Sequence, residues 1–377
     1  MNSEIREFQV FVKPVGARCN LSCSYCYYLD KRHLNAGYSA DCMNDGVLEL
    51  YIRQHIEASA GNSIFFSWHG GEPTLAGLDF YRKAVDIQKS YKPSGSVILN
   101  GIQTNATLLT EEWGKFLKEE NFFVGISLDG PAQYHNINRI GPGHIATFEK
   151  VIRGLNIIRK YNLPHEFLCV VSNDNVYSPL DIYRFFREMG ASFITFLPLV
   201  EKEIGTAHEV SRRSVRPADF GRFLMAIFDE WLENDIGKVK VQIFEEALRT
   251  AFNQEHTLCI FKPVCGGVPV VEMNGDIYSC DHYVNEDHRI GNIGERSLTD
   301  MLDDPRQKTF GQYKRTALPR YCLECEVLSM CNGECPKNRF VKTPAGEPGL
   351  NYLCEGYRDF FNHCRPFIDE VASVWKM

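Results

Sequence analysis

The hydrophobic pattern of residues 1–236 alternates between two kinds of segment. Short runs rich in β-branched and aromatic residues predict strands, and the amphipathic stretches between them repeat with the helical period. The expected strands are Gln9–Pro14, Ile64–Trp68, Val97–Gln103, Phe123–Leu128, Phe167–Ser172 and Phe193–Leu197. The expected helices are Asp45–Ile56, Leu78–Lys89, Thr110–Lys118, Thr147–Lys160, Pro179–Met189 and Pro217–Asn234. Six successive strand–helix units predict an α/β fold, a partial TIM-like (β/α)6 barrel with its chemistry at the C-terminal ends of the strands.

The pattern changes after residue 236. One further helix, Phe244–Asn253, gives way to sequence rich in Gly, Pro and Cys with little periodicity. Eight of the fourteen cysteines lie between Cys259 and Cys354. A segment with so few core-forming positions needs another source of order, and metal ligation supplies one. The sequence therefore predicts a second, Cys-rich domain over residues 237–377 that ends in a helix.

Composition narrows the class of protein without identifying it. Hydrophobic residues make up 44% and charged residues 24%, as in ordinary soluble proteins. The net charge of −7 disfavours a broad phosphate-binding surface, so no nucleic-acid partner is expected. No stretch approaches ~20 uncharged apolar residues, so no membrane span is expected. The N-terminal residues lack the pattern of a signal peptide, and we therefore expect a cytoplasmic protein.

The fourteen cysteines are the most informative feature. A reducing cytosol disfavours disulfides, so thiols at short spacings favour metal or cluster binding over a disulfide framework. Directly after the first expected strand, Cys19, Cys23 and Cys26 form a CxxxCxxC loop. Three thiolates can hold three irons of a four-iron cluster and leave the fourth iron open. The alternative, a zinc site, would need a fourth ligand, and the uneven spacing is wrong for a zinc finger.

The CxxxCxxC loop, with an aromatic residue before its last Cys, resembles that of the radical S-adenosylmethionine superfamily. The resemblance implies that the methionine moiety chelates the open iron and that one electron then generates a 5′-deoxyadenosyl radical. The second expected strand ends in Trp68-His-Gly-Gly-Glu-Pro73, which is similar to the family's GGEP turn. The resemblance implies cofactor contacts from Tyr25, Gly70, Gly71, Glu72, Ser127, Arg139 and Val200.

These residues also have ordinary structural explanations. The Gly and Pro residues could mark a simple turn, and Ser127 could be a capping hydroxyl. Arg139 could be a solvated surface residue, although its guanidinium fork also suits the cofactor carboxylate. Val200 could simply belong to the core.

The C-terminal cysteines follow a second recognisable order. Cys259 and Cys265 precede Gly275-x4-Cys280, and a CxxCx5Cx3C run and a distant Cys follow. Eight thiols are enough for two more four-iron clusters. The order resembles the SPASM extension of peptide-modifying radical enzymes. The resemblance assigns Cys259, Cys265, Cys280 and Cys335 to a first auxiliary cluster and Cys322, Cys325, Cys331 and Cys354 to a second. The remaining thiols, Cys42, Cys169 and Cys364, are expected to be structural.

Over nearly its whole length the chain resembles the anaerobic sulfatase-maturating enzymes. In the run from Val271 to Val284, the acid after the Cys would be the catalytic base, here Asp281. A carboxylate beside a cluster ligand suits proton transfer, whereas without the resemblance Asp281 would be a turn or cap residue. Two positions depart from the family pattern: His69 stands where Gln is more usual, and Ala106 replaces a usual Gly.

The resemblance implies oxygen-independent oxidation of a Cys or Ser in a sulfatase polypeptide to Cα-formylglycine. The implied cofactors are S-adenosylmethionine and three [4Fe-4S] clusters, and the implied electron donor is a flavodoxin or ferredoxin. Two other functions stay open. Another SPASM peptide maturase would form a thioether, an epimer or a carbon–carbon crosslink, but often carries an N-terminal recognition domain, for which the first strand begins too early. A non-catalytic electron carrier would have no use for an open iron.

Overall fold

The computed structural model describes residues 8–35, 40–59, 61–205 and 209–375. Most of the N-terminal segment considered for a signal peptide lies outside these residues. The chain forms two compact units. Unit 1 comprises Met1–Ser127, Arg139–His165 and Gly266–Gly311, and unit 2 comprises Leu128–Asn138, Glu166–Cys265 and Gln312–Met377. The division into domains at residues 1–236 and 237–377 stays a prediction, because compact units group segments by contact and not by family domain.

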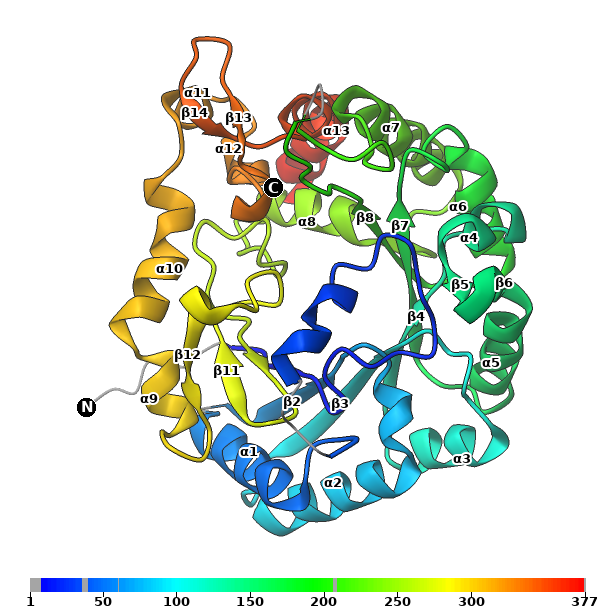
Figure 1. The fold of residues 1–377 in the computed structure, drawn as a ribbon. Coiled ribbons are helices and arrows are strands. Elements are labelled where there is room, and N and C mark those ends of the chain that lie inside the picture. The colour runs from blue at the N-terminus through cyan, green and yellow to red at the C-terminus, as the bar shows by residue number, and fades with distance from the viewer. Residues whose placement is uncertain (1–7, 36–39, 60, 206–208, 376–377) are drawn as a thin grey trace. The chain divides into compact units, whose positions relative to one another are not determined.

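Unit 1 is built on a parallel sheet (Figure 1). Its N-terminal strands are β1 (Phe11–Val12), β2 (Ser63–Trp68), β3 (Val97–Thr104) and β4 (Phe123–Ser127), each paired with the next in parallel. Val12 lies opposite Trp68, and Trp68 lies opposite Ile102. The aligned register brings the loops that follow β1, β2 and β3 to one edge of the sheet, as expected for this fold class.

The other side of β1 pairs with a segment from the Cys-rich part of the chain. β10 (Val270–Val271) runs parallel to β1, and β11 (Asp276–Tyr278) and β12 (Arg289–Asn292) continue the sheet in antiparallel fashion. These strands are yellow in Figure 1. Their shortness explains why periodicity did not predict them, since runs of two to four residues carry little alternation.

Four of the five helices of unit 1 begin and end close to predicted positions. They are α1 (Asp45–Ala58), α2 (Leu78–Tyr91), α3 (Glu111–Glu119) and α5 (Phe148–Lys160). The fifth, α9 (Leu298–Leu302), was not predicted. Side-chain caps explain two of the starts: Asn44 accepts from the backbone N of Val47 at 2.9 Å, and Thr110 accepts from that of Trp113 at 3.4 Å. A buried aromatic layer between sheet and helices includes Trp68 and Tyr81, whose ring centroids lie 5.6 Å apart.

Unit 2 contains the remaining parallel strands and most of the cysteine loops. The strands β7 (His165–Val171), β8 (Phe193–Pro198) and β9 (Lys240–Val241) pair in parallel in this order. The helices are α4 (Ala132–Asn138), α6 (Pro179–Glu188), α7 (Pro217–Asn234), α8 (Gln242–Ala251), α11 (Arg320–Leu323), α12 (Leu328–Cys331) and α13 (Cys354–Trp375). α10 (Pro305–Thr316) contains the boundary between the units. α4, α10, α11 and α12 were not predicted from the sequence.

Two short hairpins complete the fold. β5 (Ile140–Gly141) pairs with β6 (Ile145–Ala146) in unit 1, and β13 (Val341–Lys342) pairs with β14 (Pro348–Leu350) in unit 2. None of the helices in the described part of the chain combines the length and the apolar character that crossing a membrane requires.

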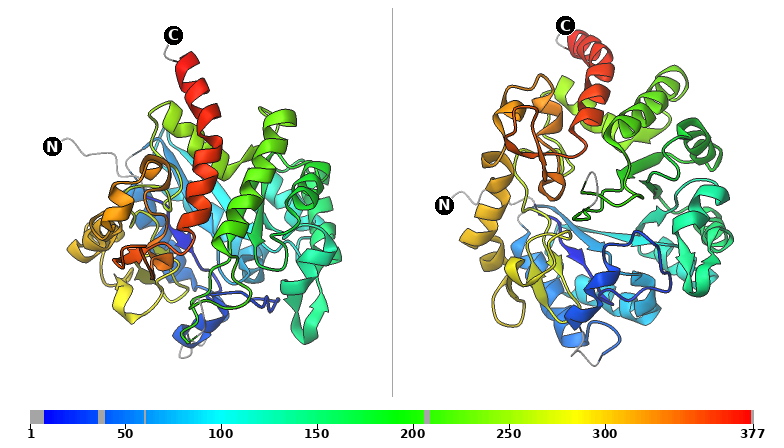
Figure 2. Two further views of the ribbon diagram at one scale, coloured as in Figure 1. Left: turned by 90° about the horizontal axis from the view of Figure 1, so that it is seen from above. Right: turned by 45° about the horizontal axis from the view of Figure 1, so that its top comes forward.

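The C-terminal helix α13 packs closely against α7, as Figure 2 also shows. At the crossing, Gly356 faces Gly221, and a Cβ on Gly356 would lie 2.1 Å from the carbonyl oxygen of Pro217. Phe220 and Tyr357 pack beside this contact with ring centroids 5.6 Å apart. Because Cys354 is the first residue of α13, the glycine contact also sets where this predicted cluster ligand lies.

Gly356→Ala is expected to destabilise the protein by about 1–3 kcal/mol, because the added methyl group meets backbone that must shift. Thermal unfolding of the purified protein measures the effect. Gly46→Ala in α1 is the matched control, since a Cβ there meets only the Asn44 side chain at 3.4 Å. The control should unfold at or above the wild-type temperature, and equal destabilisation by both changes would contradict the close contact.

Candidate active site and cluster-binding loops

The GGEP turn docks on the loop that leads into the first cysteine cluster. The backbone N of Gly71 donates to the carbonyl oxygen of Gly16 at 2.8 Å, and that of Glu72 donates to Arg18 at 2.8 Å. A Cβ on Gly71 would lie 2.0 Å from the carbonyl oxygen of Arg18. The close approach that requires this glycine is therefore made to the protein's own loop. The turn positions the chain immediately before Cys19.

The carboxylate of Glu72 is buried and fully used by neighbouring donors. One oxygen accepts from the hydroxyls of Thr74 at 2.5 Å and Thr104 at 2.7 Å, and the other accepts from the backbone N of Asn105 at 2.8 Å. Burial raises the pKa of Glu72, and these hydrogen bonds oppose the rise. Glu72 thus joins the ends of β2 and β3, and its role as a cofactor contact stays a prediction.

Asn105 links the end of β3 to the cysteine loop, which the sequence did not reveal. Its amide donates to the Asn20 side chain at 2.9 Å and approaches the Sγ of Cys19 at 3.8 Å. The backbone N of Leu21 lies 3.3 Å from the same sulfur. Donors directed at a thiolate sulfur are one of the means by which proteins tune iron–sulfur clusters. Ala106, the next residue, has φ +59, which explains why a glycine would be favoured at this position.

Burial raises the pKa of the Cys19 thiol to about 12. The hydrogen bond from the Leu21 backbone lowers this pKa, but by less than burial raises it. Iron binding would have to displace this proton, as thiolate ligation always requires. Three thiols with sulfur-directed donors nearby therefore fit the donor set of a four-iron cluster with one open iron.

Two of the predicted cofactor contacts, Tyr25 and Arg139, lie together at this loop, and a third, Ser127, lies at the end of β4. The guanidinium of Arg139 lies over the Tyr25 ring, 5.5 Å from its centroid. Arg139 is buried, so the alternative of a solvated surface arginine is wrong. The carbonyl oxygen of Ile140, in β5 directly after Arg139, accepts from the backbone N of Ser22 at 2.7 Å. This hydrogen bond joins β5 to the cysteine loop. The hydroxyl of Ser127, at the end of β4, accepts from the Gln103 amide at 3.0 Å.

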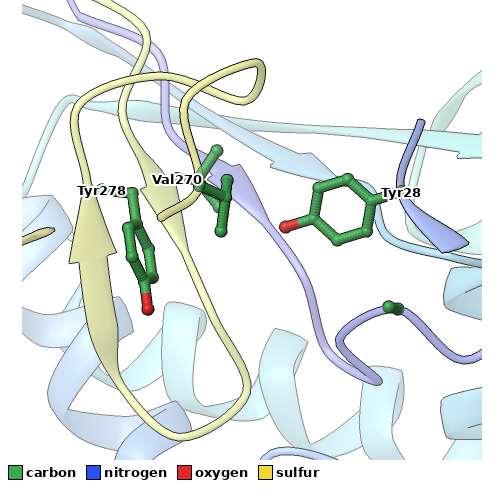
Figure 3. Close-up of a cluster of buried hydrophobic side chains, with 5 residues drawn as sticks. Tyr28, Val270 and Tyr278 are labelled. Carbon is green, nitrogen blue, oxygen red and sulfur yellow. The ribbon is translucent and has the colours of Figure 1, made fainter. Parts of the chain in front are cut away.

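A hydrophobic cluster attaches the β10–β11 hairpin to the loop that follows Cys26. Its buried members are Ala17, Tyr28, Val270, Tyr278 and Val284, with Cys26 packed against them. Figure 3 shows Tyr28 directed toward Val270. The Tyr28 hydroxyl donates to the carboxylate of Glu272, which is also buried. The cluster therefore explains how the hairpin that carries Asp281 reaches the first cysteine loop.

Asp281, the predicted base, is buried and held from two sides. The Lys13 ammonium lies 2.6 Å from one carboxylate oxygen, and the Tyr27 hydroxyl donates to the other. Lys13 is fully buried and also lies 4.2 Å from the centroid of the Tyr28 ring. Tyr27 is 46% exposed, yet its hydroxyl is turned inward to Asp281. Neither Lys13 nor Tyr27 was predicted, because nothing in the local sequence marks a partner so distant in the chain.

Opposing forces set the charge of this carboxylate. Burial raises the pKa of Asp281, but the charges of Lys13 and His282 and the hydrogen bonds from Lys13 and Tyr27 outweigh burial and lower the pKa to about 2. Burial and the adjacent Asp281 charge raise the pKa of Tyr27. At neutral pH the pair is therefore a carboxylate with a neutral phenol donor.

His69, one of the two departures from the family pattern, lies in the same region. Its ring stacks on Phe11 with centroids 3.9 Å apart, and its Nε2 lies 3.0 Å from the Ser67 hydroxyl. Burial, followed by the Lys13 charge, lowers the pKa of His69 to about 3. The imidazole is therefore neutral.

In unit 2 the four cysteines assigned to the second auxiliary cluster line one cavity. They are Cys322, Cys325, Cys331 and Cys354. Burial raises the pKa of Cys331 and of Cys354 to about 12 each. Among the described residues, no three Cys, His, Asp or Glu side chains converge as a single metal ion would require. Thiols that surround a cavity without converging fit a multi-iron cluster better than one zinc ion.

The first auxiliary site has three of its predicted ligands in unit 2. Burial raises the pKa of Cys259, and the nearby Cys265 raises it further. The Asn332 amide donates to the carbonyl oxygen of Phe261 at 2.8 Å and connects this loop to the turn before Cys335. The fourth predicted ligand, Cys280, belongs to unit 1, so this grouping of four thiols stays a prediction.

The other predicted positions are as follows. None of the fourteen cysteines, all of which are described, forms a disulfide. Cys169 and Cys364 are fully buried, as expected for structural thiols, whereas Cys42 is partly exposed. Val200 is buried in unit 2 and its contact with a cofactor stays a prediction.

The comparisons with known proteins agree with this geometry. The family model of the radical SAM superfamily matches residues 14–186, and that of an iron–sulfur cluster-binding (SPASM) domain matches residues 265–326. The chain is 42% identical over 375 residues to the serine-type anaerobic sulfatase-maturating enzyme of Bacteroides thetaiotaomicron, covering 96% of this chain and 90% of that one. It is 32% identical over 373 residues to the cysteine-type enzyme of Clostridium perfringens, covering 97% and 98%.

A solved structure extends the similarity to three dimensions. Native anSMEcpe with bound AdoMet and Cp18Cys peptide matches with a TM-score of 0.87 at 31% identity, covering 97% of this chain and 98% of that one. The fold class and the family resemblance inferred from the motifs are therefore confirmed. The chain belongs to the anaerobic sulfatase-maturating enzymes, which are radical SAM proteins with a SPASM domain.

Proposed function

We propose that this protein oxidises a serine or cysteine of a sulfatase polypeptide to Cα-formylglycine without oxygen, with Asp281 as the catalytic base. The observation that carries this proposal is the buried carboxylate of Asp281, held ionised by Lys13 and Tyr27 beside the CxxxCxxC loop. We further propose that serine is accepted, because identity is 42% to a serine-type enzyme and 32% to a cysteine-type one.

The cofactor set is part of the proposal. When bound, S-adenosylmethionine on a reduced four-iron cluster supplies a 5′-deoxyadenosyl radical that takes one hydrogen atom from the substrate Cβ. Cys19, Cys23 and Cys26 would hold that cluster, and the eight thiols from Cys259 to Cys354 would hold two more. The cofactor contacts would be Tyr25, Gly70, Gly71, Glu72, Ser127, Arg139 and Val200. A flavodoxin or ferredoxin would donate the first electron, and fourteen cysteines without a disulfide suit the reducing cytoplasm.

Asp281 would complete the oxidation. After the hydrogen atom has left Cβ, a serine side chain must lose one electron and one proton to become an aldehyde. Loss of the electron makes the hydroxyl strongly acidic, so an ionised carboxylate with a low pKa suffices as the acceptor of the proton. Lys13 would fix the carboxylate in position, and Tyr27 would orient its second oxygen.

The peptide assay tests the reaction. Reduced, reconstituted protein with S-adenosylmethionine and a peptide carrying the sulfatase motif should produce 5′-deoxyadenosine and a peptide that has lost two hydrogen atoms from Ser. A Cys peptide should lose two hydrogen atoms and exchange sulfur for oxygen. Absence of 5′-deoxyadenosine would contradict the radical chemistry, and 5′-deoxyadenosine with a different mass change would indicate another SPASM-type modification.

Asp281→Asn should reduce formylglycine formation by about 10²–10⁴-fold while 5′-deoxyadenosine still forms, because only proton transfer is removed.

Lys13→Met should lower the free energy of unfolding by about 3–5 kcal/mol, since it leaves the buried Asp281 carboxylate without its counter-charge. The double variant should regain most of that stability but not the activity. Thermal unfolding and product analysis by mass spectrometry measure these outcomes. A normal rate for Asp281→Asn would eliminate Asp281 as the base.

Iron and acid-labile sulfide analysis of anaerobically purified protein tests the number of clusters. About twelve irons per chain are expected from three four-iron clusters. Replacing Cys19, Cys23 and Cys26 together by Ala should lower the content to about eight irons. A wild-type content of about four irons would contradict the two auxiliary clusters.

A further inference from the structure

Two cations, one buried and one partly exposed, lie against the cysteine loops of unit 2 and take no part in the chemistry proposed above. Lys314, near the end of α10, is fully buried, and its ammonium donates to the carbonyl oxygens of Cys259 and Ile260, each at 2.6 Å. The second cation is Arg339, whose guanidinium is largely enclosed by backbone. Burying a charge away from water is costly unless an opposite charge compensates for it.

Arg339 holds the turn that carries Cys331 and Cys335. Its guanidinium donates to three successive carbonyl oxygens: Asn332 at 2.9 Å, Gly333 at 2.8 Å and Glu334 at 3.1 Å. A fourth hydrogen bond reaches the carbonyl oxygen of Lys314. Gly333 has φ +68, and a Cβ there would lie 2.7 Å from the guanidinium. The turn is therefore shaped around the arginine fork.

Neither cation has a carboxylate as a salt-bridge partner among the residues that the structure describes. Their hydrogen bonds go to backbone oxygens. The nearby carboxylate of Glu334 instead accepts from the amides of Asn338 at 3.1 Å and Asn351 at 2.6 Å, although its charge acts on both cations. One buried carboxylate faces two cations, so part of the compensating charge must come from elsewhere.

Thiolate ligands would supply that charge, because the cysteines must lose their protons to bind iron. The Lys314 ammonium interacts electrostatically with Cys259 and Cys265, and the Arg339 guanidinium with Cys322, Cys331 and Cys335. Between them, the two cations therefore interact with cysteines assigned to both auxiliary clusters. Net charge is one of the factors that set the reduction potential of an iron–sulfur cluster. A fixed positive charge favours the reduced form, which carries one more negative charge, and does so most where water does not screen it.

We propose that Lys314 and Arg339 raise the reduction potentials of the auxiliary iron–sulfur clusters, so that these clusters take up the electron that the substrate releases. The proposal rests on the function proposed above. In that reaction the substrate loses one electron and one proton after hydrogen abstraction. Asp281 would take the proton, and an oxidised auxiliary cluster held by these cysteines would supply the acceptor of the one electron. Lys314 and Arg339 are positioning residues, since they act on the clusters and touch no substrate.

The test is a redox titration of the anaerobically reconstituted full chain, without S-adenosylmethionine or peptide. Electron paramagnetic resonance monitors the reduction of the clusters at each potential. The background protein carries Ala at Cys19, Cys23 and Cys26, so that only auxiliary clusters contribute signals. Lys314→Gln and Arg339→Gln should each lower an auxiliary midpoint potential by about 59 mV or more, a tenfold change in the one-electron equilibrium. Lys314→Arg and Arg339→Lys keep the charge and should stay closer to wild type.

Arg315→Gln is the matched control. It removes the same charge one residue from Lys314, but Arg315 is exposed, so water screens its effect. Unchanged potentials in both Gln variants at full iron content, or a shift as large in Arg315→Gln, would overturn the proposal. Loss of iron from both Gln variants but not from the charge-keeping ones would also overturn it, because the cations would then be needed for assembly only. Formylglycine formation is assayed separately, so failure of the proposed reaction remains distinguishable from failure of this tuning.

Discussion

The buried ion pair between Lys13 and Asp281 is the contact on which the arrangement of the active site depends. Lys13 follows β1, near the start of the chain, and Asp281 follows β11, in its Cys-rich part. Two charges removed from water stabilise a fold only if their geometry is good, so the pair strongly penalises any structure in which the two segments separate. Parallel pairing of β1 with β10 and the apolar cluster around Tyr28 hold the same two segments together.

The motif residues also hold the loops of the candidate active site in place. Gly71 and Glu72 of the GGEP turn bind the protein's own backbone and hydroxyl groups, and in doing so they fix the loop ahead of Cys19. Asn105 does the same from the end of β3. A radical intermediate requires that reacting atoms stay in place, and loops that are hydrogen-bonded on all sides are suited to that requirement. Motif residues can therefore matter for catalysis through the loops they hold.

The Cys-rich part of the chain solves a different problem. It has little apolar periodicity, so metal ligation and buried polar contacts must hold its loops. Arg339 and Lys314 fill part of that role, because both cations donate hydrogen bonds to backbone oxygens of the cysteine loops and lie close to thiol groups there. Charge and loop geometry are consequently coupled in unit 2, at the loops that carry the predicted cluster ligands.

The sequence by itself determined the strands β1, β2, β3, β4, β7 and β8, most helices, the CxxxCxxC loop and the Cys order of the SPASM region, because periodicity and spacing are local properties that one chain displays directly. The role expected for Asp281 came from resemblance, not from periodicity. Only the tertiary structure decided that Lys13, Tyr27 and Glu272 surround this region, that Gly71 approaches Arg18, and that Arg139 is buried. Those facts depend on contacts between distant segments, such as the pairing of β1 with β10. β1 was expected within Gln9–Pro14, but the two residues of β10 carry no readable pattern, because so short a strand gains its stability from packing rather than from local preference.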